Sequence, residues 1–184
     1  MPSVTAAEVI AFWREAGAPR WFAKDEAFDA AIHARFEAAH HAAARGEFAH
    51  WSLDWEGALA LLILLDQFPR NLFRGSAHAF ATDPLALSLA RKAVAAGLDQ
   101  VAPADLRVFF YLPFEHSEAL VDQDRCLKLC AALDATSGSE WSKWAALHRD
   151  IIVRFGRFPH RNAMLGREST AEEQAFLDDG GFAG

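Results

Sequence analysis

Apolar residues recur along this chain at helical spacing, and capping residues, glycines and prolines interrupt them at intervals. No run of strand length alternates apolar and polar residues with period two. The pattern therefore predicts an all-α fold of about eight helices, joined by short loops that favour antiparallel helix pairs. The expected helices lie within residues 5–17, 25–46, 54–68, 83–97, 103–113, 115–134 and 141–155, and from residue 169 onward.

Individual residues mark where these helices begin. Thr5 and Glu8 have the spacing of a capping box, and Ser169 and Glu172 repeat that spacing near the end of the chain. The stretch Ala58–Leu65 is apolar on every side, so we expect a central helix surrounded by others. A length of 184 residues predicts a single domain over residues 1–184. Further N-cap residues are expected at Asp25, Asp54 and Asp83.

One short pattern occurs twice. Residues 66–75 read DQFPRNLFRG and residues 155–167 read FGRFPHRNAMLGR, and in each Phe-Pro precedes Arg-Asn and a glycine. Because proline disfavours helix for the residue before it, Phe68 and Phe158 are expected to end their helices. The match indicates a weak internal duplication. We expect the two helix exits to face each other, with Glu115 and His116 between or beside them, because the pattern is matched and the three segments carry complementary charges that are costly to bury unpaired.

Composition narrows the classes of function. The formal net charge is −7 and the isoelectric point is near 5.6, which argues against a nucleic-acid or anionic-membrane binder. The longest apolar run is too short to span a bilayer, and the N-terminus lacks the pattern of a secretory signal. Cys126 and Cys130 cannot complete a cysteine-based zinc site or a disulfide framework. We therefore expect a cytoplasmic protein with buried thiols, no metal and no cofactor.

Several long motifs resemble a known family. WFAKDEAFDAAIHARF, GALALLILLDQFPRNLFRG, YLPFEHSEALVDQ, HRDIIVRFGRFPHRN and LGREST are similar to the uncharacterised bacterial family called domain of unknown function 924, from about Trp21 to Leu177. The resemblance implies a tetratricopeptide-like, superhelical bundle of antiparallel helix pairs and no established activity. Its signature positions here are Asp66, Gln67, Arg70, Asn71, Glu115, His116, Arg157, Pro159 and Asn162.

Arginines and asparagines around the two exits form the first part of a candidate site. Arginine presents a planar fork that binds carboxylate or phosphate through two hydrogen bonds, so one reading is a clamp for a small anion. The other reading is structural, in which these arginines pair with Asp66, Glu115, Glu118 or Asp122. The candidate ligand-binding residues are Asp66, Arg70, Asn71, Arg74, Arg154, Arg157, His160, Arg161 and Asn162.

Three other residues are candidates for proton transfer. Glu115 and His116 could act as an acid/base pair, or could form a buried hydrogen-bonded pair without catalytic use. His148 lies on the apolar stripe of its helix and is either a third catalytic candidate or a core histidine. His160 lies among arginines, whose positive charge favours a neutral imidazole.

Three hypotheses follow from these residues. The first is a small-anion binding protein or an enzyme acting on such an anion, with an Arg/Asn clamp beside a Glu-His pair. The second is a tetratricopeptide-like interaction module that binds an acidic peptide or a carboxylate terminus. In the third, the polar residues only organise the core. Two Glu-x-x-His motifs, at residues 37–40 and 47–50, do not make a di-iron site, since that site needs such motifs on two helices plus further glutamates.

Overall fold

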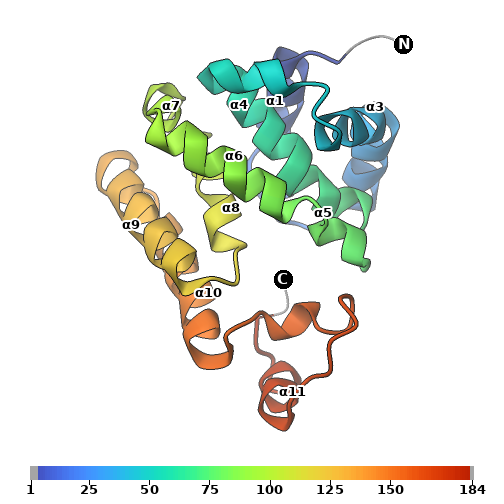
Figure 1. Cartoon of the computed structure of the whole chain (residues 1–184), viewed down its shortest axis with the longest axis vertical. Coiled ribbons are helices and arrows are strands. Elements are labelled where there is room, and N and C mark those ends of the chain that lie inside the picture. Colours follow the sequence, from blue (N-terminus) through green and yellow to red (C-terminus); the bar gives the residue numbers. More distant parts are fainter. Residues whose placement is uncertain (1–3, 183–184) are drawn as a thin grey trace. The chain divides into compact units, whose positions relative to one another are not determined.

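The computed structural model describes residues 4–182, and within that range every regular element is helical, so the all-α prediction is confirmed (Figure 1). The described part of the chain divides into two compact units. The first unit runs to Arg74 and resumes over His78–Pro113, and the second comprises Gly75–Ala77 and the chain from Phe114 onward. The expectation of a single domain over residues 1–184 stays a prediction.

In the first unit, α4 lies at the centre, in contact with α1 and α6. Every residue from Gly57 to Leu65 is buried, as the all-round apolar run predicted. Trp13 of α1 is fully buried and packs against Phe28, Phe68 and Phe109 with ring centroids 5.5–6.0 Å apart. The helices of this unit are α1 (Ala6–Ala16), α2 (Ala18–Trp21), α3 (Glu26–Ala44), α4 (Trp55–Leu62), α5 (Phe68–Leu72), α6 (Asp83–Ala95) and α7 (Leu98–Val101).

Most of the expected helix starts are confirmed. Thr5 and Glu8 form the capping box of α1, and the carboxylates of Asp25 and Asp54 accept hydrogen bonds from the first turns of α3 and α4. The N-cap of α6 is Thr82 rather than Asp83, and Asp83 pairs with an arginine instead. The last capping box also lies one residue later than expected, on Thr170 and Glu173. Ser169 is outside that box, and its hydroxyl accepts a hydrogen bond from Asn162.

The helix exit expected at Phe68 is wrong. Residues Ile63–Gln67 form a π-helical turn, and the chain continues through Pro69 into α5. Proline normally clashes with the carbonyl four residues earlier and removes a hydrogen bond to it. Here that carbonyl belongs to Leu65 and accepts a hydrogen bond of 2.5 Å from the Thr82 hydroxyl. The wider turn and the external donor together allow the helix to pass the proline.

Side chains also satisfy the neighbouring carbonyls of the π-helical turn. His40 Nδ1 donates to the Leu64 carbonyl at 2.8 Å, and Arg70 donates to the Asp66 carbonyl at 2.5 Å. Three successive carbonyls, at positions 64, 65 and 66, therefore have side-chain donors. Buried backbone groups need such partners wherever the regular helical ladder is interrupted.

In the second unit, α9 and α10 pack side by side as a helical hairpin, joined through Gly138 in the left-handed conformation (Figure 1). The second exit is confirmed, because α10 ends at Gly156 and Phe158 is extended. The helices here are α9 (Leu120–Ser137), α10 (Trp141–Phe155) and α11 (Ala171–Asp178), with a 3-10 turn at Pro159–Arg161. The chain passes from the first unit to the second within α8 (Leu112–Glu115).

Two expected helices differ from the structure. Residues 103–113 contain only a 3-10 turn, Arg107–Phe110, and the start of α8. The helix expected over 115–134 begins at Leu120. Gln123 explains the break, because its amide donates to the carbonyls of Glu115 and Ser117 at 2.6 and 2.7 Å and so stabilises a non-helical turn. Within residues 4–182, no helix has both the length and the apolar character needed to cross a membrane.

Candidate functional site

The second unit contains a buried pair formed by Glu115 and His148. The Oε1 atom of Glu115 lies 3.3 Å from the Nδ1 atom of His148, and both side chains are almost fully buried. The same Nδ1 lies 2.9 Å from the carbonyl oxygen of Trp144. Since a carbonyl can only accept, Nδ1 carries a proton, and in the neutral form of the ring the lone pair is on Nε2. The structure thus places His148 of α10 against Glu115, the residue that the sequence had paired with His116.

An aromatic frame surrounds this pair and joins it to two further candidates. The His148 ring packs edge-on against Phe158 and Phe182, at 5.7 and 4.6 Å between centroids. His160 contacts the same two rings, at 5.6 and 5.4 Å. The guanidinium of Arg161 lies 4.6 Å above the Phe158 ring and is itself buried. Glu115, His148, His160 and Arg161 therefore share one neighbourhood within the second unit.

His116 reaches this neighbourhood through its backbone. Its carbonyl oxygen accepts a hydrogen bond of 3.1 Å from Nη1 of Arg161. This contact links the segment after α8 to the 3-10 turn that begins at Pro159. It gives Arg161 a fixed position beside Glu115.

The two cysteines border the pair and are both buried. Cys126 Sγ lies 3.8 Å from Cys130 Sγ and 3.9 Å from Oε2 of Glu115. The neighbouring Cys130 thiol and burial raise the pKa of Cys126 far above its ordinary value. The thiol therefore stays protonated, and it is a packing group and weak hydrogen-bond donor rather than a nucleophile.

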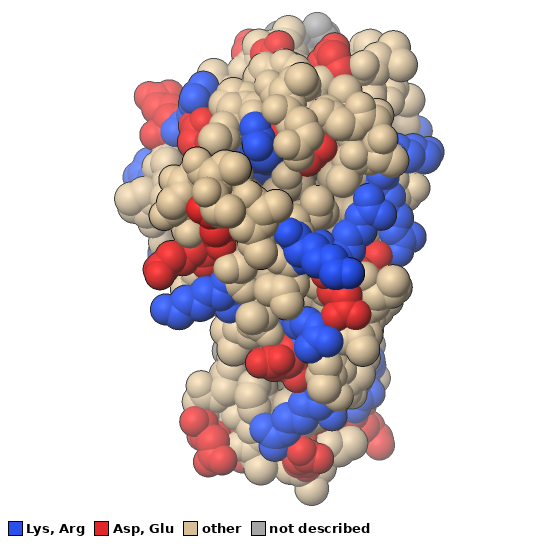
Figure 2. Space-filling model, turned by 90° about the vertical axis from the view of Figure 1, so that its left-hand side faces the viewer, with Lys and Arg blue, Asp and Glu red and all other residues tan. Residues whose placement is uncertain are grey.

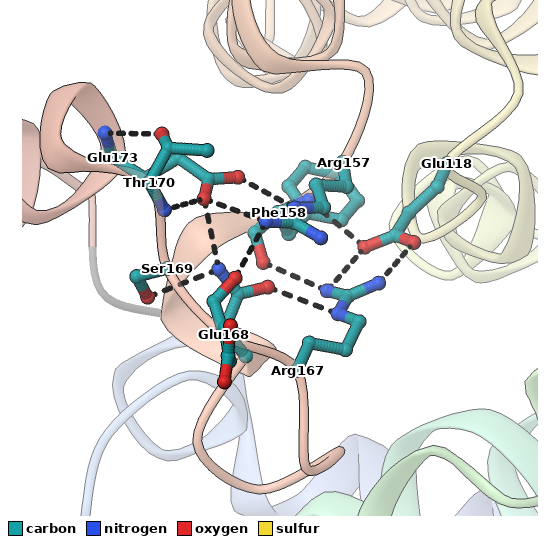
Figure 3. A network of polar contacts seen from close by, with 9 residues as sticks. Glu118, Arg157, Phe158, Arg167, Glu168, Ser169, Thr170 and Glu173 are labelled. Carbon is teal, nitrogen blue, oxygen red and sulfur yellow. Dashed lines mark hydrogen bonds and ion pairs between the residues drawn. The ribbon is translucent and has the colours of Figure 1, made fainter.

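Arg157, the first arginine after α10, binds a buried carboxylate. Its Nε and Nη2 atoms donate to the two oxygens of Glu173 at 2.6 and 2.7 Å (Figure 3). The side chain of Glu173 is only 3% exposed. The hydrogen bonds from Arg157, together with those of the capping box, lower the pKa of Glu173 to about 2. Arg157 thus fastens the N-terminus of α11 to the end of α10.

Asn162 and Arg167 extend the same network. Asn162 donates to Ser169 and to Glu173 at 3.1 and 3.3 Å, and it accepts from Nε of Arg167 at 2.9 Å. Arg167 donates two further hydrogen bonds to Glu118, at 2.7 and 2.9 Å (Figure 3). Sequence reasoning missed Arg167, whose signal was its place directly after Gly166 at the end of the second repeated pattern.

Glu118 also holds the loop at Phe158. Its Oε1 atom accepts a hydrogen bond of 2.8 Å from the Phe158 backbone N–H. Burial by itself would raise the pKa of Glu118, but Arg167 and this N–H lower it by more. The Glu118–Arg167 ion pair therefore fixes the backbone of Phe158, whose ring contacts His148 and Arg161.

Arg154 differs from Arg157 in exposure. It pairs with Glu172 at 2.9 Å, and the two side chains are 52% and 64% exposed. A surface groove of about 460 Å³ runs between the end of α10 and the start of α11, lined by both arginines, Phe155, Thr170, Glu172 and Glu173. An exposed pair of this kind contributes little stability and leaves Arg154 able to exchange partners.

The candidates from the first repeated pattern also have carboxylate partners, all within the first unit. Arg70 donates two hydrogen bonds to Asp83 at 3.0 and 3.1 Å and lies 3.5 Å from the buried carboxylate of Asp66. Asp66 in turn accepts from the amide of Gln67 at 2.6 Å. Arg70 thus joins the π-helical turn to the start of α6.

Asn71 and Arg74 converge on one residue of α3. Asn71 donates to Asp29 at 2.7 Å, and Arg74 donates two hydrogen bonds to the same carboxylate at 2.8 and 2.9 Å. Burial would raise the pKa of Asp29, but these donors lower it overall. Asp29 could not be predicted as a partner from local sequence patterns, because it lies 42 residues before Asn71.

The two repeated patterns have different local structures. Residues 66–75 include a π-helical turn and α5, whereas residues 155–167 include the end of α10 and a 3-10 turn. The expectations of an internal duplication and of two adjacent exits stay predictions.

Figure 2 shows Lys and Arg side chains interspersed with Asp and Glu over the face that it presents. In the described part of the chain, no three His, Cys, Asp or Glu side chains are grouped so as to hold a metal ion.

Comparison with known proteins shows the family. Residues 9–181 match the family described as bacterial protein of unknown function DUF924. The chain belongs to this family. The resemblance seen in the sequence motifs is therefore confirmed over nearly the whole chain.

A solved structure supports the same conclusion. The chain is 51% identical to a protein of unknown function from Agrobacterium tumefaciens, with a TM-score of 0.89 over 95% of this chain and 97% of that one. A search of curated proteins finds no match. Neither the description of the DUF924 family nor that of this relative names a reaction or a ligand. The function therefore has to be inferred from the residues of the site.

Proposed function

We propose that this DUF924 protein binds a small anion, a carboxylate or phosphate, and that the Glu115–His148 pair exchanges a proton with it. The observation that carries the proposal is the 3.3 Å contact between Glu115 and His148 Nδ1, in a buried setting next to Arg161. The Trp144 carbonyl and the Glu115 carboxylate both favour the tautomer with the proton on Nδ1, and the carboxylate also increases the basicity of Nε2. Histidine is the side chain whose ordinary pKa best suits proton exchange near neutral pH.

Arg161 supplies the anion-binding half of the proposal. It lies over the Phe158 ring that the His148 ring also contacts, and Phe158 holds both groups on one frame. Guanidinium groups bind carboxylates and phosphates through paired N–H donors, and partial burial strengthens such contacts. His160, on the same frame, adds a second imidazole for hydrogen bonding.

The other arginines support the structural reading for their own positions. Arg70, Arg74 and Arg157 each place two N–H groups on one carboxylate of the protein, so little of their fork is left for a ligand. The proposed anion site is accordingly smaller than the full set of candidates. It comprises Glu115, His148, His160 and Arg161.

A ligand screen followed by variants tests this proposal. Small carboxylates and phosphates are screened for a rise in melting temperature, since a ligand specific for the folded state stabilises it by mass action. For a compound that raises the melting temperature, binding is compared between the parent and Arg161→Gln. The His148 imidazole is then titrated by NMR with and without the compound. We expect weaker binding by Arg161→Gln and a shift of the His148 titration.

His33 provides a matched control for the titration. It lies on α3, its side chain is 58% exposed, and it pairs with Glu37 at 3.4 Å. Its NMR signals should be the same with and without the compound. The proposal fails if no compound stabilises the parent while Glu115→Gln and His148→Gln lower the melting temperature, because the pair then only organises the core.

A further inference from the structure

A groove on the first unit has features of a ligand site that the proposed function does not use. It lies between α1 and α3, next to α2, and has a volume of about 360 Å³. Phe12 and Phe28 line it with their rings stacked, at 5.4 Å between centroids and 8° between planes. Glu15, Arg20, Arg35 and three alanines complete the lining.

Each phenyl ring of this groove has a guanidinium over it. Arg35 lies 4.7 Å from the centroid of Phe12, and Arg20 lies 5.6 Å from that of Phe28. Arg35 also lies 5.0 Å from the centroid of Phe36, a buried residue of the core. Cation–π contact holds a guanidinium flat on the ring and leaves the N–H groups at its edge available for hydrogen bonds.

The two arginines differ in their acidic partners. Arg20 pairs with Asp25 at 3.1 Å. Among residues 4–182, no carboxylate lies within 4 Å of the Arg35 guanidinium, and no hydrogen bond to it is formed. The acid that attracts Arg35 from a greater distance is Glu8, whose Oε2 atom already accepts two hydrogen bonds of 2.8 Å from Thr5. Arg35 is thus a positioned cation whose N–H donors the described chain leaves to solvent or to a ligand.

We infer that this groove binds a small aromatic carboxylate, with its carboxylate on Arg35 and its ring against Phe12. The volume suits a small molecule and is at the low end of ligand-pocket volumes. Phe28 is buried beneath Phe12, and the partly exposed Phe12 ring favours an aromatic body on the ligand, since aromatic rings gain from edge contacts beyond area burial. Glu15 disfavours a second negative charge on the ligand, so a monoanion fits better than a dianion.

This inference is independent of the proposed function. All groove residues belong to the first unit, whereas Glu115, His148, His160 and Arg161 belong to the second. A variant at Arg35 therefore leaves the Glu115–His148 pair unchanged. The groove and the Glu115–His148 site can thus be tested separately, and either proposal can fail while the other holds.

The test measures binding of 3-phenylpropionate by NMR titration of the full chain, following the Arg35 side-chain Nε–H signal. The charge-reversed probe is 2-phenylethylamine, which keeps the ring and replaces the carboxylate by an ammonium. We expect saturable binding of 3-phenylpropionate and none of the amine. Arg35→Gln should weaken binding roughly ten-fold or more, since charge-assisted bidentate contacts are about twice as strong as neutral ones.

Two further variants complete the design. Arg45→Gln is the matched control, because Arg45 follows the same helix, is 61% exposed and pairs with Glu47 outside the groove. It should bind as the parent does. Phe12→Leu keeps an apolar side chain and removes one stacked ring, so it should weaken binding while retaining the fold, as checked by circular dichroism. Equal affinity in the parent and Arg35→Gln, equal binding of the amine, or no saturable binding by the parent would overturn the inference.

Discussion

Arg157 and Glu173 are joined by two hydrogen bonds of 2.6 and 2.7 Å, with the Arg157 side chain 29% exposed and the Glu173 side chain buried. The pair connects the residue after the Gly156 cap of α10 to the third residue of α11. Because Glu173 also completes the capping box with Thr170, one carboxylate serves both the local helix start and a tertiary contact.

Arg157→Ala should destabilise the protein far more than Arg154→Ala. Removal of Arg157 leaves the buried Glu173 without its counter-charge, whereas Arg154 and Glu172 are both exposed. We expect a loss of about 5–10 °C in melting temperature for Arg157→Ala and less than about 2 °C for Arg154→Ala. Similar losses in both variants would mean that the burial of Glu173 is unimportant.

Acid should unfold the parent through Glu173. Its pKa is lowered from 4.5 to about 2 in the folded state, so the unfolded chain binds protons more readily as the pH falls. The stabilisation is present above pH 4.5 and is lost as the pH falls toward about 2. Urea unfolding at several pH values between 6 and 2.5 should show this slope, and Arg157→Ala should reduce it.

His40 should give stability a second pH dependence. Burial lowers the pKa of His40 below 6.5, although its hydrogen bond to the Leu64 carbonyl acts in the opposite direction. Protonation therefore favours the unfolded chain, and stability should increase as the pH rises through the region below and around 6.5. His40→Gln, which keeps a donor and cannot titrate, should remove this dependence when unfolding is measured between pH 5 and 8.

The tautomer of His148 can be observed directly. The carbonyl of Trp144 and the carboxylate of Glu115 both face Nδ1, so nitrogen NMR of the neutral ring should show a proton on Nδ1 and a lone pair on Nε2. Glu115→Gln should keep this tautomer, because the Trp144 carbonyl remains. A neutral ring with its proton on Nε2 would contradict the proposal that Nε2 accepts the proton.

Local signals in the sequence were sufficient for some elements. Thr5 and Asp25 cap their helices through bonds to residues three positions away, and this information lies within one turn. The path through Pro69 depends instead on Thr82, and the partner of Asn71 and Arg74 lies on α3. Partners at such separations are set by tertiary packing, so residue types and spacing predicted the reactive groups without predicting which ones meet.

The same limit applies to the candidate site. Glu115 and His148 were both predicted, but neighbouring positions along the chain favoured His116 as the partner of Glu115. The turn that Gln123 stabilises removes His116 from the helix that was expected over residues 115–134. The helical stripe of α10 then brings His148, 33 positions further on, to the carboxylate.

The π-helical turn makes residue count as important as residue identity in the DQFPRN segment. One extra residue in a turn displaces every later side chain by about 100° around the helix axis. Arg70 and Asn71 follow that turn, and they point to Asp83 and Asp29 in the displaced register. A chain that lost one of the three apolar residues Ile63, Leu64 or Leu65 would keep every letter of the motif and still direct its arginine and asparagine away from these carboxylates.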